Sequence, residues 1–247
     1  MRKKEVLNLY KSRTKVYKDS NGLVSKLQAN KRDFMVRETA FLTQIIYKNE
    51  QITFTKKNDK FPSNQLWVFR LVSEDTQRFV DAVMAGDKEF VCPEKKPVNA
   101  TNIDYDDSYG TITGTDVNSA YWTIARNLGI ISEKTHNRVM ADEYKVVRLA
   151  ALAILGRNMV YKEFKGGEVQ KDPFIYKGSD ISKSLYKAIR YTCYQHMENI
   201  SLLLGDDFDA YRTDCIYYRD TPENRKKVYD YLDQHGFYYK QLEFEDN

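Results

Sequence analysis

Residues 208–244 have the sequence FDAYRTDCIYYRDTPENRKKVYDYLDQHGFYYKQLEF, and this stretch decides the fold. Its first part alternates between apolar and polar residues, which predicts strands at 208–211 and 215–218. Only residues 212–214 separate the two strands, so we expect a tight hairpin connection there.

The second part of the stretch predicts a helix followed by a strand. Thr221 followed by Pro222 is typical of a helix start, with Thr as the cap and Pro at the first helical position. Gly236 is expected to end this helix. Residues 237–244 are then rich in aromatic residues and predict the final strand.

Three elements upstream complete the pattern. A strand is predicted at 111–116, a helix at 119–128 that ends at Gly129, and a long helix at 180–204. When the excursion between 119 and 178 is left out, the order is strand, helix, strand, strand, helix, strand. This is the order of a split βαβ, ferredoxin-like or RRM-like domain, an α+β fold in which helices cover one face of an antiparallel sheet.

The composition changes near residue 108, which divides the chain into regions 1–108 and 109–247. In the first region we expect an α+β arrangement with a helix at 34–47, strands at 51–55 and 65–72, and a helix from 73 to 84. Its first 33 residues are dense in Lys and Arg, which fits either an arm that contacts phosphate or a solvated lead-in. Within the second region, residues 132–154 predict one long helical register.

Whole-chain properties exclude several classes of protein. The 247 residues are 42% hydrophobic and 30% charged, as in ordinary globular proteins, and the net charge is +4. The longest apolar run, 149–155, is far too short to span a bilayer, and no signal peptide is apparent. The three cysteines are widely spaced, which predicts a reducing, cytoplasmic setting. Since no long apolar run is present, we expect no membrane association.

Two carboxylates are expected to meet in the predicted sheet. Asp116 ends the strand at 111–116, and Asp214 lies in the hairpin between the next two strands. These strands are neighbours in the ferredoxin-like order, and a carboxylate pair is what two Mg²⁺ ions require in phosphoryl transfer. The alternative is that Asp116 caps the following helix and Asp214 is an ordinary turn residue.

Three segments resemble the motifs of family B DNA polymerases. DVNSAYW at 116–122 is similar to motif A, and closest to the DVNSLYP form of the protein-primed branch. RLAALAILGR at 148–157 is similar to motif B, and YRTDCI at 211–216 to motif C. The motifs follow in the family's order, and the predicted strand order is that of the polymerase palm. The resemblance also suggests a phage or mobile-element origin.

The resemblance implies roles for single residues. Asp116 and Asp214 would be catalytic and would bind Mg²⁺ or Mn²⁺, with the Val117 carbonyl as a further ligand. The remaining implied positions contact the nucleotide: the amides of Ser119 and Ala120 at a helix N-terminus, Tyr121 beneath the sugar where it excludes a 2′-hydroxyl, and Arg148 and Arg157 on the triphosphate.

Departures from the family pattern limit this function. Arg212 replaces the first acid of motif C, and Leu152, Ala153 and Leu155 stand where motif B has Asn, Ser and Tyr. The short spacing between the first two motifs implies fingers reduced to a helical insertion at about 130–178. Residues 1–108 show no exonuclease motif, and residues 215–247 are too few for a thumb.

These observations leave two hypotheses. The first is a minimal family B-like DNA polymerase that extends a primer on a DNA template with dNTPs, without proofreading, and with a priming or processivity protein as a further partner. The second is a catalytically impaired palm-derived protein that binds nucleic acid or serves in an assembly.

The sequence supports a binding role less strongly for the other polar candidates. Gly166-Gly167 among lysines fits a phosphate loop or, better, a hairpin turn. His196 lies on an apolar helical face and is expected to be a core histidine rather than a ligand.

Overall fold

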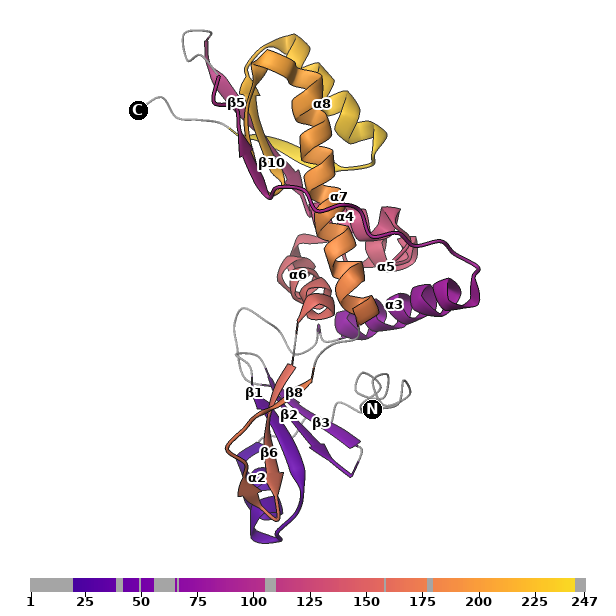
Figure 1. Ribbon diagram of the computed structural model, residues 1–247, viewed down its shortest axis with the longest axis vertical. Coiled ribbons are helices and arrows are strands. Elements are labelled where there is room, and N and C mark those ends of the chain that lie inside the picture. Colours follow the sequence, from indigo (N-terminus) through magenta and orange to yellow (C-terminus); the bar gives the residue numbers. More distant parts are fainter. Residues whose placement is uncertain are drawn as a thin grey trace. The chain divides into compact units, whose positions relative to one another are not determined.

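The computed structural model describes residues 20–38, 42–48, 50–55, 65, 67–104, 110–157, 159–176 and 180–242. The chain divides into two compact units, each built from two separate segments. Unit 1 consists of residues 1–78 and 139–183, and unit 2 of residues 79–138 and 184–247. The change in composition near residue 108 therefore falls inside unit 2 and does not coincide with the boundary between the units (Figure 1).

Unit 1 contains an antiparallel sheet with strand order β3-β2-β1-β6-β7, and β8 also pairs with β6. The bounds are β1 Phe34–Glu38, β2 Leu42–Tyr47, β3 Glu50–Thr55, β6 Met159–Lys165, β7 Glu168–Val169 and β8 Phe174–Tyr176. Helix α2, Ser20–Ala29, contributes Leu27 to the core of this sheet, in which Phe34 stacks on Phe164 with 4.3 Å between ring centroids.

The helix predicted at 34–47 is wrong, because this segment forms β1 and β2. The apolar spacing that indicated a helix also fits two short strands, and burial of Phe34 and Val36 follows the two-residue period of a strand. The strand predicted at 51–55 is confirmed by β3.

Gly166 and Gly167 form the turn of a hairpin between β6 and β7, as the hairpin interpretation predicted. Both have positive φ angles, 57° and 83°, which glycine adopts without strain. A Cβ atom on Gly167 would lie 2.4 Å from the carbonyl oxygen of Gln28, so this position has no room for a side chain.

The strand predicted at 65–72 is also wrong. Residues Trp67–Ala85 form helix α3, which ends next to Gly86 as expected. Val68, Val72 and Phe79 are buried at helical spacing, and this periodicity extends across the whole segment.

The long helix predicted at 132–154 is interrupted. The segment forms α5 (Glu133–Arg138), the short helix η3 (Asp142–Tyr144), α6 (Lys145–Ala153) and η4 (Ile154–Gly156). Between α5 and α6 the carbonyl groups of residues 139–141 accept hydrogen bonds from the guanidinium of Arg148.

Unit 2 contains a second antiparallel sheet with strand order β11-β5-β10-β9-β4. Apart from β4, which was not predicted, its elements follow the sequence prediction closely. They are β4 Asn99–Thr101, β5 Ile112–Asn118, α4 Ala120–Asn127, α7 Asp180–Leu204, β9 Phe208–Arg212, β10 Cys215–Arg219, α8 Pro222–Gln234 and β11 Tyr238–Leu242. The chain is therefore α+β, with two antiparallel sheets in the described residues.

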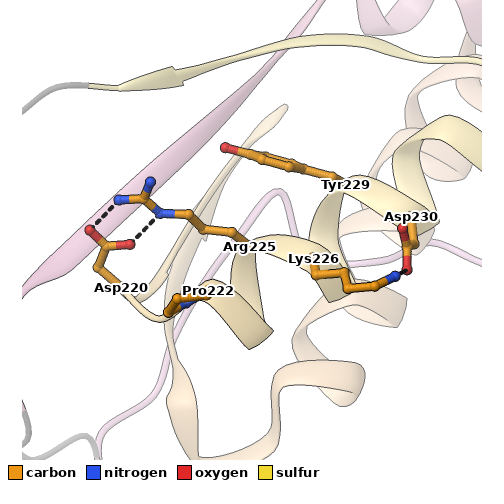
Figure 2. Close-up of a pocket in the computed structure, with 6 residues that line it drawn as sticks. All are labelled: Asp220, Pro222, Arg225, Lys226, Tyr229 and Asp230. Carbon is orange, nitrogen blue, oxygen red and sulfur yellow. Dashed lines mark hydrogen bonds and ion pairs between the residues drawn. The ribbon is translucent and has the colours of Figure 1, made fainter.

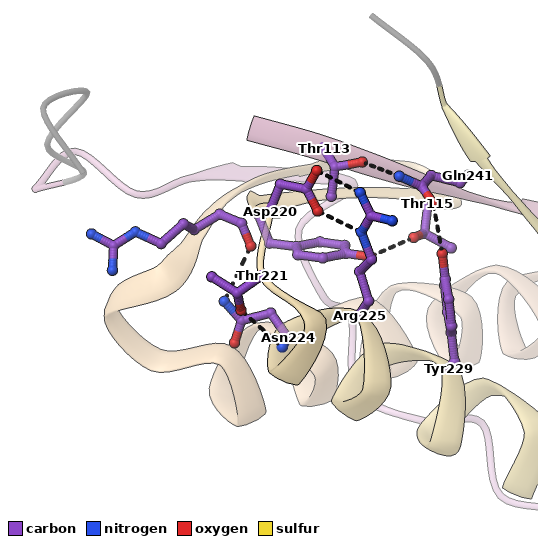
Figure 3. A network of polar contacts seen from close by, with 10 residues as sticks. Thr113, Thr115, Asp220, Thr221, Asn224, Arg225, Tyr229 and Gln241 are labelled. Carbon is purple, nitrogen blue, oxygen red and sulfur yellow. Dashed lines mark hydrogen bonds and ion pairs between the residues drawn. The ribbon is translucent and has the colours of Figure 1, made fainter. Parts of the chain in front are cut away.

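One face of this second sheet is covered by helices. Thr113, Thr115 and Val117 of β5 are buried on that face. Figure 1 shows α7 and α8 along the same side of the sheet, and Figure 3 shows Tyr229 of α8 bonded to Gln241, which in turn donates to Thr113. The residues of β5 between these three, including Asp116, belong to the opposite face.

Among the described residues, no helix combines the length and apolar character that a bilayer crossing requires.

Candidate functional site

Asp116 and Asp214 lie close together, as the sequence predicts. Asp116 in β5 is directly opposite Cys215 in β10, the residue that follows Asp214. In addition, the Val117 amide donates to the Asp214 carbonyl at 2.9 Å. Because paired strands lie about 5 Å apart and successive residues are about 3.4 Å apart along a strand, the two aspartate α-carbons lie within about 8 Å.

The Asp116 side chain belongs to a row that crosses four strands. The strand register places Arg212, Cys215, Asp116 and Lys240 side by side on β9, β10, β5 and β11. Directly paired residues project to the same face of a sheet. This charged row therefore lies on the sheet face that α7 and α8 do not cover.

Lys240 is the direct partner of the Asp116 carboxylate. Its Nζ atom lies 3.5 Å from Asp116 Oδ2, and the two side chains are 59% and 31% exposed. Exposed ion pairs of this kind contribute little to stability, typically below about 1 kcal/mol. The lysine is thus easily displaced from the carboxylate by a stronger cation.

Tyr217 and Gly114 form the next row on this face. A Cβ atom on Gly114 would lie 3.2 Å from the Tyr217 ring and 3.0 Å from Leu242 Cδ1, so both side chains approach the glycine closely. A hydrogen bond to Cys215 is the main reason why the pKa of the Tyr217 hydroxyl is raised, and the Asp116 charge adds to this effect. The Tyr217 hydroxyl therefore lies at the edge of the carboxylate site.

Both aspartates influence the pKa of the Cys215 thiol. Burial is the main cause of its raised pKa, and the negative charges of Asp116 and Asp214 raise this pKa further. Since electrostatic influence decreases with distance, both aspartates lie near the Cys215 thiol.

The connection that carries Asp214 has a defined shape. Thr213 has a φ of 58°, and its amide donates to the Val98 carbonyl at 2.9 Å. On the other side, the Cys193 thiol of α7 lies 3.6 Å from the Thr213 carbonyl. The turn is therefore held from two sides, which fixes the backbone of Asp214 beside β5.

A sharp turn after β5 places the first amides of α4 near Asp116. Ser119 has a φ of 54° and precedes Ala120, the first residue of the helix. Its carbonyl accepts from the amides of Trp122 and Thr123. The first amides of a helix have no partner within the helix and favour anions. The local geometry therefore suits the predicted contact of Ser119 and Ala120 with a triphosphate, which stays a prediction.

Tyr121 follows in the first turn of α4. Its hydroxyl lies 3.1 Å from the Tyr194 hydroxyl of α7. Burial, followed by this hydrogen bond, raises the pKa of Tyr121 well above its usual range. The residue is therefore a neutral phenol at physiological pH.

The two arginines of the motif B-like segment lie in unit 1. Arg148 is buried, and one of its terminal nitrogens donates to the carbonyls of Val139, Met140 and Ala141 at 2.9–3.0 Å. Burial lowers the pKa of its guanidinium. Arg148 thus has a structural role at this turn, while Arg157 is exposed after η4; their contact with a triphosphate stays a prediction.

The oxygen donors at Asp116 and Asp214 fit Mg²⁺ that enters together with a phosphate ligand. Mg²⁺ is typically held by one or two carboxylates, waters and substrate phosphates. The Val117 carbonyl points to the same side of β5 as its amide, toward the Asp214 turn. No group of three or more His, Cys, Asp or Glu side chains suited to a metal occurs in the described part of the chain, so substrate oxygens would have to complete the coordination.

The other sequence candidates have structural partners. His196 Nδ1 lies 2.8 Å from the Tyr231 hydroxyl, and burial lowers its pKa to about 4, in line with a core histidine. A pocket on α8, shown in Figure 2, contains Arg225 and Lys226, but Asp220 and Asp230 pair with these cations. The pocket thus offers no unbalanced charge to a ligand.

Sequence reasoning missed Lys240, Tyr194 and Arg190. Lys240 was detectable in principle, because pairing of the last strand with the first in the predicted order places one of its residues opposite Asp116. The Tyr194 contact depends on how α7 packs against α4, and no local pattern signals such packing.

No protein-family model, curated protein or solved structure matches this chain.

Proposed function

We propose that this protein is a minimal family B-like DNA polymerase, a nucleotidyltransferase that extends a primer with dNTPs and lacks proofreading. The observation that carries this proposal is the strand register, which sets Asp116 opposite the residue after Asp214. The strand order β11-β5-β10-β9 also supports it, since this is the order of a ferredoxin-like palm with β4 added at one edge.

The proposed reaction is in-line nucleotidyl transfer. The primer 3′-hydroxyl oxygen forms a bond to the α-phosphorus of the dNTP, the bond from this phosphorus to the bridging oxygen breaks, and pyrophosphate leaves. Asp116 and Asp214 would hold Mg²⁺, which when bound lowers the pKa of the hydroxyl and offsets charge on the leaving group. The amides of Ser119 and Ala120 bind and orient the phosphates.

Lys240 and Arg212 favour a second candidate function. They flank Asp116 in the same cross-strand row, and Lys240 already pairs with its carboxylate. Two cations on the sheet face opposite α7 and α8 are also suited to phosphate contacts without catalysis. A palm-derived nucleic-acid-binding or assembly protein would use this face as a binding surface alone.

A primer-extension assay distinguishes the two functions. The full chain is incubated with labelled primer-template, dNTPs and Mg²⁺ or Mn²⁺, beside Asp116→Asn and Asp214→Asn. As a control, Asp230→Asn removes a carboxylate on α8 that pairs only with Lys226 in the described contacts. Extension that both site variants abolish and the control retains supports the polymerase, whereas DNA binding without extension under either metal refutes it and favours the second function.

A further inference from the structure

The side chain of Tyr121 is linked by hydrogen bonds to two residues of α7, Tyr194 and Arg190. Its hydroxyl lies 3.1 Å from the Tyr194 hydroxyl, and Arg190 donates to that same Tyr194 oxygen from Nε at 3.1 Å and from its terminal nitrogen at 3.0 Å. Arg190 and Tyr194 are one helical turn apart, and the guanidinium lies 5.7 Å from the centre of the Tyr194 ring.

The arginine determines the direction of the hydrogen bonds. A guanidinium has only donors, so the Tyr194 oxygen must accept from Arg190. The same Tyr194 oxygen lies 3.1 Å from the Tyr121 hydroxyl, so Tyr194 connects the guanidinium to Tyr121.

Burial makes this arrangement rigid. Tyr194 is 2% exposed, and Tyr121 is half-buried with its ring at the start of α4. The hydrogen bond that Arg190 donates to Tyr194 raises the pKa of the Arg190 guanidinium, because it stabilises the charged form. Arg190 is therefore a cation at physiological pH.

We propose that Arg190 and Tyr194 are positioning residues that fix the ring and hydroxyl of Tyr121, and that they thereby determine discrimination between deoxyribose and ribose. This inference rests on the proposed function and on the position beneath the sugar that the resemblance to family B DNA polymerases implies for Tyr121. Neither residue is proposed to contact the substrate. They act through Tyr121, which they hold at the N-terminal turn that follows Asp116 and Ser119.

The experiment compares Tyr194→Phe and Arg190→Gln with Tyr191→Phe, a matched control on the same helix. Arg190→Lys keeps a donor to Tyr194 and serves as the conservative variant. Primer extension gives kcat and KM for a dNTP and its rNTP counterpart, with Tyr121→Ala as the reference for lost discrimination. A second measurement follows the Tyr121 signal in protein labelled with ¹³C at the tyrosine Cζ atom, assigned by its loss in Tyr121→Phe.

We expect Tyr194→Phe and Arg190→Gln to reduce the preference for dNTP by about five- to twentyfold, with kcat for dNTP within about twofold of the unaltered protein. Arg190→Lys should regain part of this preference, and Tyr191→Phe should behave as the unaltered protein. In the labelled protein, Tyr194→Phe should shift the Tyr121 signal and Tyr191→Phe should not.

Two results would overturn the inference while the proposed function stands. One is unchanged sugar preference in Tyr194→Phe when Tyr121→Ala loses it, and the other is unchanged preference in Tyr121→Ala itself. Absence of extension in the unaltered protein would instead refute the proposed function and the sugar role with it. In that case the Tyr121 signal still reports whether Tyr194 positions the ring.

Discussion

Replacing Lys240 by Gln should strengthen divalent metal binding at the Asp116 carboxylate. The Lys240 ammonium lies 3.5 Å from Asp116 Oδ2, near the region where a metal ion bound to that oxygen would lie. A Mg²⁺ ion about 2.1 Å from the same oxygen would lie no farther than about 5.6 Å from Nζ, and we take about 5 Å as the separation. The lysine and the metal are competing cations at one carboxylate.

The size of the effect follows from Coulomb's law. A charge of +2 and a charge of +1 at about 5 Å repel by about 1.7 kcal/mol in water, and screening at physiological salt reduces this to about 1 kcal/mol. Both side chains are substantially exposed, so the dielectric of water is the appropriate one. We expect metal affinity to rise by about five- to fifteenfold in Lys240→Gln, and by less at high salt.

The assay is a Mn²⁺ titration followed by electron paramagnetic resonance of the free ion, with and without a non-hydrolysable deoxynucleoside triphosphate. Lys226→Gln is the matched control, since Lys226 also pairs with an aspartate but lies on α8. Asp116→Asn should abolish the binding. Equal Mn²⁺ affinity in Lys240→Gln and the unaltered protein would refute the competition, and weaker binding would show that Lys240 assists the ligand.

Three further changes test other parts of unit 2. Arg212→Asp adds a carboxylate to the row that contains Asp116, so primer extension should stay or rise; a sharp loss would give Arg212 a role of its own. The pKa of His196 is lowered to about 4 from 6.5, so its contribution to stability is present above pH 6.5 and is lost as the pH falls toward 4. The loss is at most about 3 kcal/mol because the ring is partly exposed. Urea unfolding at pH 7 and 4.5 should show a smaller difference in the free energy of unfolding for His196→Phe than for the unaltered protein. An equal difference would contradict this origin. Thr221→Ala removes the acceptor of the Asn224 amide at 3.1 Å and should lower the free energy of unfolding by about 1 kcal/mol in urea, while Thr221→Ser should not.

The sequence predicted unit 2 well because its signals are local and agree with one another. Gly129 and Gly236 adopt positive φ angles just after their helices, and Thr221 accepts a hydrogen bond as a helix cap. Helix α7 begins and ends where its apolar periodicity predicted. Each of these signals depends only on neighbouring residues, and long-range packing does not oppose them.

The failures in unit 1 and at α5–α6 have a different cause. At 34–47 and 65–72 the apolar residues fit both a helix and a strand, and the pairing of β1 with β6, more than a hundred residues away, decides the outcome for the first. At 139–144 the helix stops because Arg148 binds the released carbonyls. No local pattern contains such contacts.

The same distinction applies to the candidate site. The adjacency of Asp116 and Asp214 follows from strand order, which the sequence contains, but the charges around them follow from register. Carboxylates that lie close together repel each other unless cations are near. In the free protein Lys240 and Arg212 supply positive charge in the same row, so the site is balanced before any metal enters. The two proposed functions then differ in one physical respect. A polymerase must exchange Lys240 for a metal when the nucleotide arrives, whereas a binding protein keeps this lysine on Asp116 or transfers it to a phosphate of the nucleic acid.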